Sequence, residues 1–209
     1  MSLSPHNSLA DERVCLEEKV AHLMSQLSHT SREVRVEAAV ALIRIGDEPM
    51  FKDLLLALRH TEPRVVVGAA LTLGRIGDRR AVQGLIQAFK TDDQNVGAAV
   101  AWALGRCKDT QALPWLMLAI EQGFVVAHAC EALGQIGDAR ALEPLVLAAA
   151  STMEDAKAYA LRAIGMLNFA LCSHLVPDVI GLLRSHLQDP SRKVRLCVAL
   201  SLHALSQKK

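Results

Sequence analysis

A twelve-residue pattern recurs six times along this chain of 209 residues, and it constrains the fold more than any other feature. The segments are VRVEAAVALIRI from residue 34, VVVGAALTLGRI from 65, VGAAVAWALGRC from 96, VVAHACEALGQI from 125, AKAYALRAIGML from 156 and VRLCVALSLHAL from 194. They end at positions 45, 76, 107, 136, 167 and 205, so the steps between them are nearly even, with a slightly short step from 107 to 136 and a long one from 167 to 205. Self-similarity at a period of about 20 to 50 residues is the signature of repeat architectures. The chain is therefore predicted to be a stack of similar units.

Each unit is predicted to contain two helices, because most repeated segments end in a stop signal that is followed by another apolar run. Ile-Gly-Asp occurs at 45–47, 76–78 and 136–138, and Arg-Cys-Lys-Asp replaces it at 106–109. Glycine ends helices in the left-handed conformation, and aspartate caps the start of the next helix. The prediction is an all-α superhelix, a solenoid of about six helical hairpins, with a flexible tail at 1–11 and a single repeat domain at 12–207.

Composition excludes several classes of protein. The chain is 51% apolar and only 3% aromatic, which suits closely packed helices, and its 23 Lys and Arg against 22 Asp and Glu lack the excess of a nucleic-acid binder. No apolar run reaches the roughly 18 residues of a membrane span, and the N-terminal sequence does not resemble a signal peptide. We therefore expect a cytoplasmic protein that binds neither nucleic acid nor membranes. The cysteines are expected to be small hydrophobic residues in a reducing compartment: Cys15, Cys107, Cys130, Cys172 and Cys197.

The repeated segments resemble HEAT repeats, in particular the phycobilisome-lyase type, whose second helix ends in the ALGxIGD pattern seen here at 132–138. The resemblance covers about residues 12 to 207. It implies an α-solenoid that is used mostly as a binding surface, and such a fold does not by itself carry an activity. The long last step, with LNFALCSHLVPD at 167–178 in place of a tight joint, departs from the family pattern. The sequence therefore leaves the boundary of the final unit open.

A helical wheel divides the repeated segment into a core arc, two flanks and a strip. In the first unit the predicted core arc contains Val34, Ala38, Leu42 and Ile45. The flanks are columns of small residues, as expected where equivalent helices of neighbouring units meet. A further column consists of the glycines Gly74, Gly105, Gly134 and Gly165. Crowding between second helices explains these glycines better than close approach of a partner, because they recur with the repeat.

The strip roughly opposite the core arc is predicted to line the inner, concave wall of the solenoid. The residues predicted to contact a partner are Arg44, Leu71, Arg75, Trp102, Arg106, His128, Glu131, Tyr159 and Arg162. Trp, Tyr and Arg are the usual anchors of protein interfaces. A purely structural alternative is that Trp102 packs on Leu71 and Arg106. Under the same alternative, the arginines pair with Glu37 and Glu131.

No catalytic motif, cofactor site or metal site is predicted. His128 and Glu131 lie three residues apart, but no third ligand shares the strip, and the His-Glu pairs of deoxyhypusine hydroxylase are missing. A resemblance to alkylpurine DNA glycosylases is opposed by the even charge balance and by Glu131. We predict a non-enzymatic scaffold that binds a partner polypeptide on its concave face. The alternative is a bilin lyase-like subunit that handles a tetrapyrrole on a phycobiliprotein.

Overall fold

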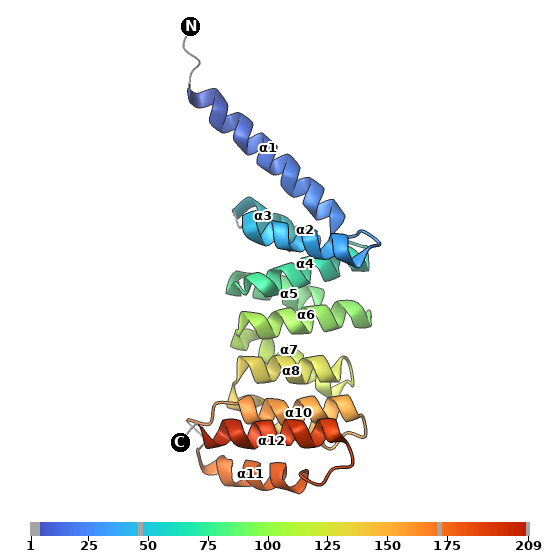
Figure 1. Ribbon diagram of the computed structural model, residues 1–209, viewed down its shortest axis with the longest axis vertical. Helices are drawn as coiled ribbons and strands as arrows, with labels where there is room; N and C mark the ends of the chain where they lie inside the picture. Colours follow the sequence, from blue (N-terminus) through green and yellow to red (C-terminus); the bar gives the residue numbers. More distant parts are fainter. Residues whose placement is uncertain (1–4, 46–47, 171–172, 208–209) are drawn as a thin grey trace.

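The computed structural model describes residues 5–45, 48–170 and 173–207, and the described residues form twelve α-helices and no β-sheet (Figure 1). The helices are α1 (Pro5–Gln26), α2 (Arg32–Ile45), α3 (Glu48–Ala57), α4 (Pro63–Ile76), α5 (Val82–Ala88), α6 (Gln94–Cys107), α7 (Leu113–Glu121), α8 (Val126–Ile136), α9 (Leu142–Ala149), α10 (Glu154–Met166), α11 (Val176–Ser185) and α12 (Arg192–Ser206). The predicted all-α class and the six helical pairs are confirmed.

The hairpins stack along one axis and form two layers (Figure 1). The second helices, α2, α4, α6, α8, α10 and α12, make one layer, and the first helices α3, α5, α7, α9 and α11 make the other. Neighbouring second helices contact each other along their length, whereas neighbouring first helices contact each other sparsely. In a curved stack the layer with the closer helices lies inside. We therefore call the second helices the inner layer and the first helices the outer layer.

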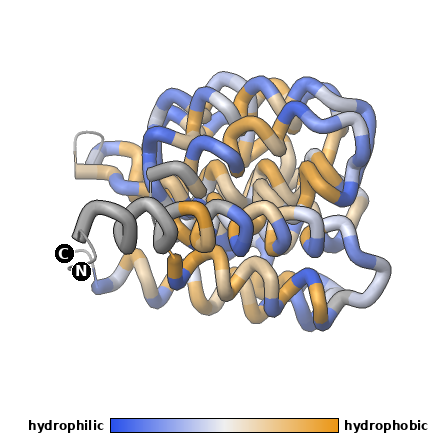
Figure 2. Tube along the Cα trace, turned by 90° about the horizontal axis from the view of Figure 1, so that it is seen from above, coloured by the Kyte–Doolittle hydropathy of each residue, from blue (hydrophilic) through white to orange (hydrophobic). Residues whose placement is uncertain are grey.

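The core lies between the two layers. Seen along the stack, apolar residues alternate with polar ones around the helices, and polar residues gather at the turns (Figure 2). The inner layer contributes fully buried apolar residues at equivalent positions, as the core arc predicts: Leu42, Leu73, Leu104, Leu133 and Ile164. The outer layer supplies a matching series: Leu54, Leu85, Leu116, Leu145 and Leu183. Each unit therefore buries these residues against its own hairpin and its neighbours, and the core is continuous along the stack.

The predicted stop signals form the joints between units. Gly77 has the left-handed conformation (φ 71°), and its N–H donates to the carbonyl of Leu73 over 2.9 Å. The Asp78 carboxylate then accepts a 2.8 Å hydrogen bond from the N–H of Arg80 at the start of a short 3-10 turn, η1 (Arg79–Ala81). Gly137 and Asp138 repeat this geometry before η3 (Ala139–Ala141). The equivalent Gly46 and Asp47 lie outside the described residues.

The third joint reaches the same geometry without a glycine. Lys108 takes the left-handed conformation (φ 51°), although a non-glycine residue adopts it at a cost, and Asp109 accepts from the N–H of Gln111 before η2 (Thr110–Ala112). The last joint has no glycine-aspartate pair. There the N–H of Asn168 donates to the carbonyl of Gly137 over 2.7 Å, and η4 (Ser173–Leu175) precedes α11.

The glycine column marks where the helices of the inner layer touch. A Cβ atom on Gly105 would lie 2.7 Å from Cα of Ala132, and one on Gly134 would lie 2.8 Å from Cα of Ala163. Both distances are shorter than carbon atoms tolerate, so only glycine permits this approach of the two backbones. Gly165 meets Ser201 of α12 in the same way. The crowding explanation is therefore confirmed, and α12 keeps the aligned register despite the longer last step.

The N-terminal helix departs from the expected boundary. In Figure 1, α1 runs obliquely away from the stack, and its C-terminal part is buried at Val20 and at Leu27, which follows the helix. The helix begins at Pro5, so it starts within the segment 1–11 that was expected to be a tail, while residues 1–4 lie outside the described residues. The start of the repeat domain at residue 12 stays a prediction.

Three cysteines behave as small core residues. Cys107, Cys130 and Cys197 are buried, and burial raises the thiol pKa to about 11 for Cys107 and to about 12 for Cys130. The nearby carboxylates of Asp78 and Asp109 add to the effect at Cys107. Cys15 is exposed because it lies on the part of α1 that leaves the stack, and Cys172 lies outside the described residues.

Candidate functional site

The nine predicted partner-binding residues all lie on helices of the inner layer, between α2 and α10. Their positions on these helices place them opposite the buried leucines, so they share one surface, which we call the inner strip. Six of them are exposed: Arg44, Leu71, Arg75, Arg106, His128 and Arg162. Three are half-buried: Trp102, Glu131 and Tyr159. That these residues contact a partner stays a prediction.

Three arginines occupy the same place in consecutive units. Arg44, Arg75 and Arg106 each lie in the last turn of their helix and are exposed. Among the residues that the structure describes, none of the three has an ion pair within 4.0 Å or a side-chain hydrogen bond. Among the described residues the arginines therefore form no ion pair with Glu37 or Glu131 within 4.0 Å, and they lie at a solvent-exposed edge.

Trp102 packs against the preceding unit and is also partly exposed at the surface. The position that a Cβ atom would take on Gly74 lies 2.6 Å from Cζ3 of Trp102, so the indole ring covers the glycine of the preceding unit. The ring is only half-buried, and its remaining surface faces outward from the inner layer. Trp102 packs on Gly74, a contact that the sequence did not predict. A change at Trp102 therefore affects both stability and any contact made at this surface.

The fourth and fifth units hold a small polar hollow of about 30 Å³. Its lining comes from α8 and α10: Glu131, Gln135, Tyr159, Arg162, Ala163 and Met166. The carbonyl oxygen Oε1 of Gln135 is buried without a hydrogen-bond partner among the described residues and lies over Gly105, 3.0 Å from where its Cβ would be. Above Tyr159 the Nζ atom of Lys193 lies 4.7 Å from the ring centroid, and its pKa is raised by its 2.6 Å bond to Asp155. A cation and a buried acceptor thus flank this hollow.

The inner strip also contains a hollow at its N-terminal end. Here α1 diverges from α2 and leaves a space of about 480 Å³ that contains Lys19 and Arg44 together with apolar side chains such as Val36 and Val40. Among the residues that the structure describes, no three His, Cys, Asp or Glu side chains gather as a metal site would require, and the side chain of His128 is exposed. This hollow therefore combines charged and apolar side chains, among them Glu37 beside Lys19 and Arg44 in its lining.

Exposed apolar residues near the C-terminal end were not among the predicted site residues. Met166, Leu196 and Leu200 are 39%, 59% and 49% exposed and lie on α10 and α12. Leu196 and Leu200 fall in the same columns of the repeat as Val36 and Val40, so the aligned pattern contained a signal for them. The inner strip therefore continues onto the last unit as an apolar surface.

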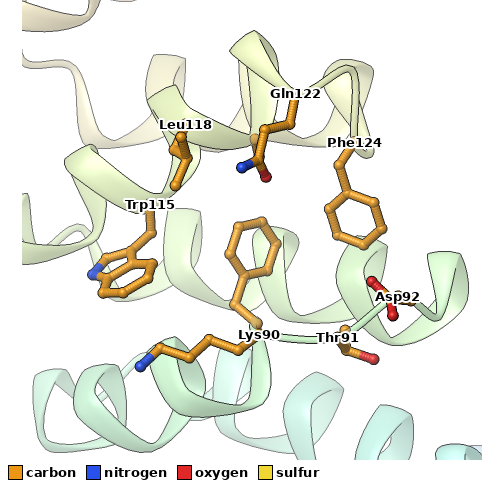
Figure 3. Close-up of a pocket in the computed structure, with 9 residues that line it drawn as sticks. Lys90, Thr91, Asp92, Trp115, Leu118, Gln122 and Phe124 are labelled. Atoms are coloured by element: carbon orange, nitrogen blue, oxygen red, sulfur yellow. The ribbon is translucent and has the colours of Figure 1, made fainter.

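The outer layer carries two further hollows. One of about 430 Å³ lies between α7 and the segment after α5, where Lys90 extends toward Trp115 on one side and Phe124 lies on the other (Figure 3). The Nζ atom of Lys90 lies 4.9 Å from the centroid of Trp115, and the rings of Phe89 and Phe124 meet edge to face at 6.0 Å. A second hollow of about 740 Å³ lies between α11 and α12.

The turn that presents Phe124 is strained. Val125 has a positive φ of 39°, which is a rare conformation for a β-branched residue, and it follows Gly123 with a φ of 71°. The ring of Phe124 sits over Gly97, where a Cβ atom would lie 2.5 Å from the ring. This turn belongs to the unit with the short step, between positions 107 and 136. The strain is therefore explained by the shortened connection and does not by itself indicate a ligand.

The family of the chain follows from comparison with known proteins. The family model for HEAT repeats matches twice, over residues 20–99 and 82–165, and so covers most of the stack. The chain is a HEAT-repeat protein. No curated protein sequence is significantly similar to it. The HEAT-repeat assignment accounts for the hairpins and the two layers, and it leaves the function to the side chains on their surface.

Solved structures share the architecture of this HEAT-repeat protein. The complex of CpcE and CpcF of phycocyanin lyase from Nostoc sp. PCC7120 matches with 24% identity and a TM-score of 0.64, over 88% of this chain and 75% of that one. A designed armadillo repeat protein in complex with the peptide (KR)4 matches with 16% identity and a TM-score of 0.58, over 88% and 98% of the two chains. An engineered protein matches with 20% identity and a TM-score of 0.56, over 90% and 98%. At these identities the likeness shows the fold.

The structure also bears on the expectation that the protein does not enter membranes. Within the described part of this HEAT-repeat protein, none of the helices has the length and apolarity that crossing a bilayer demands.

Proposed function

We propose that this HEAT-repeat protein is a binding scaffold that holds a segment of a partner polypeptide on its inner strip. The observation that carries the proposal is the row of three exposed arginines, without ion-pair partners among the described residues, beside the half-buried ring of Trp102. The close-packed helices present these side chains from a backbone that does not have to be ordered on binding, and Arg and Trp are among the residues that most often dominate such contacts. A designed armadillo repeat protein that holds a peptide shows that this architecture suits the role.

A selection experiment tests the proposal. A display library of random peptides is panned against the immobilised full-length protein, and enriched peptides are titrated against variants. Trp102→Ala should weaken binding by about 2 kcal/mol or more, roughly thirtyfold, because a large apolar ring at the centre of the strip is lost. The measurement is a fluorescence anisotropy titration alongside a thermal melt.

Trp115→Ala is the matched control. It removes an equally half-buried indole from the outer layer, and it should lower the melting temperature without weakening peptide binding. Because Trp102 covers Gly74, both variants are expected to be less stable than the wild type. A library without enriched peptides would contradict the proposal, and so would equal binding by both variants.

A second candidate function is that of a bilin lyase-like subunit. The observation that favours it is the likeness to the complex of CpcE and CpcF of phycocyanin lyase. Under this candidate the protein should bind a free bilin and acquire a visible absorption band that shifts from that of the bilin in buffer. An unchanged spectrum at saturating protein would contradict the candidate and leave the scaffold proposal as it stands.

A further inference from the structure

Positive charge on the inner strip is concentrated in the first three units. Arg44, Arg75 and Arg106 repeat once per unit, and Lys19 adds a cation beside Arg44 in the N-terminal hollow. Within the described part of these units, the strip carries one carboxylate, the exposed Glu37. The aspartates of the joints are engaged elsewhere, because Asp78 pairs with Arg80 over 2.8 Å and Asp109 caps η2. The first half of the strip therefore presents an excess of cations in a row.

Helix capping does not explain the row. A cation in the last turn of a helix is favourable because it faces the negative end of the helix dipole. However, α8 and α10 carry Gln135 and Met166 at the equivalent position and are as regular as α4 and α6. The structure thus forms these helices with or without the arginine. The charge is in excess of what the fold requires, and it is available to an external anion.

The spacing of the three arginines favours one backbone conformation for an acidic polypeptide that binds them. Each arginine takes the same position on its helix, so neighbouring arginines are separated by roughly the distance between the helix axes, about 8 to 10 Å. A polyproline II chain rises about 3.1 Å per residue and has three residues per turn, so every third side chain returns to the same face after about 9 Å. In a β-strand the side chains of one face recur after only about 6.7 Å. This spacing is nearer to the polyproline II repeat than to the strand repeat.

We propose that the first three units bind an extended acidic polypeptide segment in the polyproline II conformation, with Asp or Glu at every third position and one carboxylate on each of Arg44, Arg75 and Arg106. This deepens the proposed function and rests on it. Guanidinium groups and carboxylates form paired hydrogen bonds, which makes arginine suited to this task. The acidic run ends at the fourth unit, where Glu131 replaces the apolar residues of the strip and repels further carboxylates.

The first arm of the test varies the register of charge. The full-length protein is titrated by fluorescence anisotropy with labelled peptides of about nine residues that carry glutamate at every third position. Matched peptides of the same composition carry the glutamates adjacent to one another or at alternate positions, and a fourth carries lysine at every third position. The every-third glutamate peptide should bind about tenfold more tightly than the others, and its affinity should fall as salt rises. Equal binding by the alternate-position peptide would overturn the assigned register, and tighter binding by the lysine peptide would overturn the proposal.

The second arm varies the arginines. Each of Arg44→Ala, Arg75→Ala and Arg106→Ala should weaken binding about fivefold, as expected for exposed ion pairs with good geometry. Arg59→Ala, at an exposed arginine just after α3, is the matched control and should have no effect. The Arg75→Glu variant should not bind the acidic peptide. It should bind a peptide in which the middle glutamate has been replaced by lysine. Failure of this charge exchange, or an effect of Arg59→Ala as large as the others, would overturn the proposal.

The third arm separates this inference from the proposed function and from binding of nucleic acid. Peptides enriched from the random library that are acidic support both ideas, whereas enriched peptides that are neutral or basic overturn the inference and leave the scaffold function standing. A single-stranded oligonucleotide with the same number of negative charges serves as a further competitor. If it binds more tightly than the every-third glutamate peptide, the strip recognises phosphates and the inference is overturned.

Discussion

The inner and outer layers of the stack are built from the same units by different means. In the inner layer, glycines such as Gly105 and Gly134 let backbones touch the alanines of the next helix. In the outer layer, neighbouring helices touch little, and they expose apolar side chains such as Leu56 and Leu147. Contact between units is therefore made mainly by the inner layer. These contacts hold the helices that carry the inner strip in place, which makes this surface suitable for binding a partner.

The largest expected effect comes from removing the same side chain in each layer. Leu104→Ala should lower the free energy of unfolding by about 2 to 5 kcal/mol, because Leu104 has no exposed surface and its loss leaves a cavity. Leu147→Ala, on the outer layer at 62% exposure, should change it by less than about 0.5 kcal/mol. Urea unfolding followed by circular dichroism measures both. Similar losses in the two variants would break the contrast between the layers.

The second prediction makes the same glycine-to-alanine substitution once in each layer and expects opposite effects on stability. Gly134→Ala should destabilise the protein by about 1 to 3 kcal/mol, because its Cβ would lie 2.8 Å from Cα of Ala163 and the helices must separate. Gly181→Ala in α11 meets nothing within 4 Å and should stabilise the protein by about 0.5 to 1 kcal/mol, because alanine leaves the unfolded chain less conformational entropy to lose. Thermal melts of the two variants decide the matter. Stabilisation by Gly134→Ala would show that the inner helices can part at no cost.

The smallest effect is expected at the joints that connect the layers. The side chain of Arg140 and the N–H of that residue lower the pKa of Asp138, so the folded protein holds its carboxylate in the charged form. A pKa lowered on folding stabilises the protein above the unfolded value near 3.9, and this contribution is lost as the pH falls through the folded value. Asp138→Ala should therefore cost about 1 kcal/mol at pH 7, as expected for a lost cap, and less near pH 3.

Asp53→Ala on the exposed face of α3 is the control for loss of charge alone. It should show little change at pH 7. A cost for Asp138→Ala that stays constant from pH 7 to pH 3 would indicate that the carboxylate does not act through its charge.

Much of this architecture could be predicted because it depends on short-range patterns. Leu104 and its equivalents lie on one arc of a helix, and Gly137 with Asp138 forms a joint through hydrogen bonds to its own neighbouring backbone. The exposure of six of the nine site residues followed in the same way, because the strip consists of the helix positions that lie opposite the core arc. Repetition strengthened each inference, because a signal that is weak in one unit recurs in the next.

Other features depend on how two units meet, and one segment alone does not encode that. The indole of Trp102 covers Gly74 only because α6 approaches α4 closely enough, so its burial followed from the stack and not from its wheel position. The helix α1 contacts α2 and leaves Val14 and Leu16 exposed, an orientation that its own sequence pattern did not predict.

The strained turn at Val125 has a consequence for how such a protein can change over generations. The step that contains this turn is shorter than the others and the last step is longer, yet Ala132 still meets Gly105 and Ser201 still meets Gly165. Insertions and deletions are thus absorbed in the connections, at a local conformational cost, while the contact between backbones is preserved. Duplication, loss or exchange of a whole unit should therefore be tolerated wherever the small residues at both faces are kept. A longer or shorter recognition surface can arise by recombination without redesign of the core.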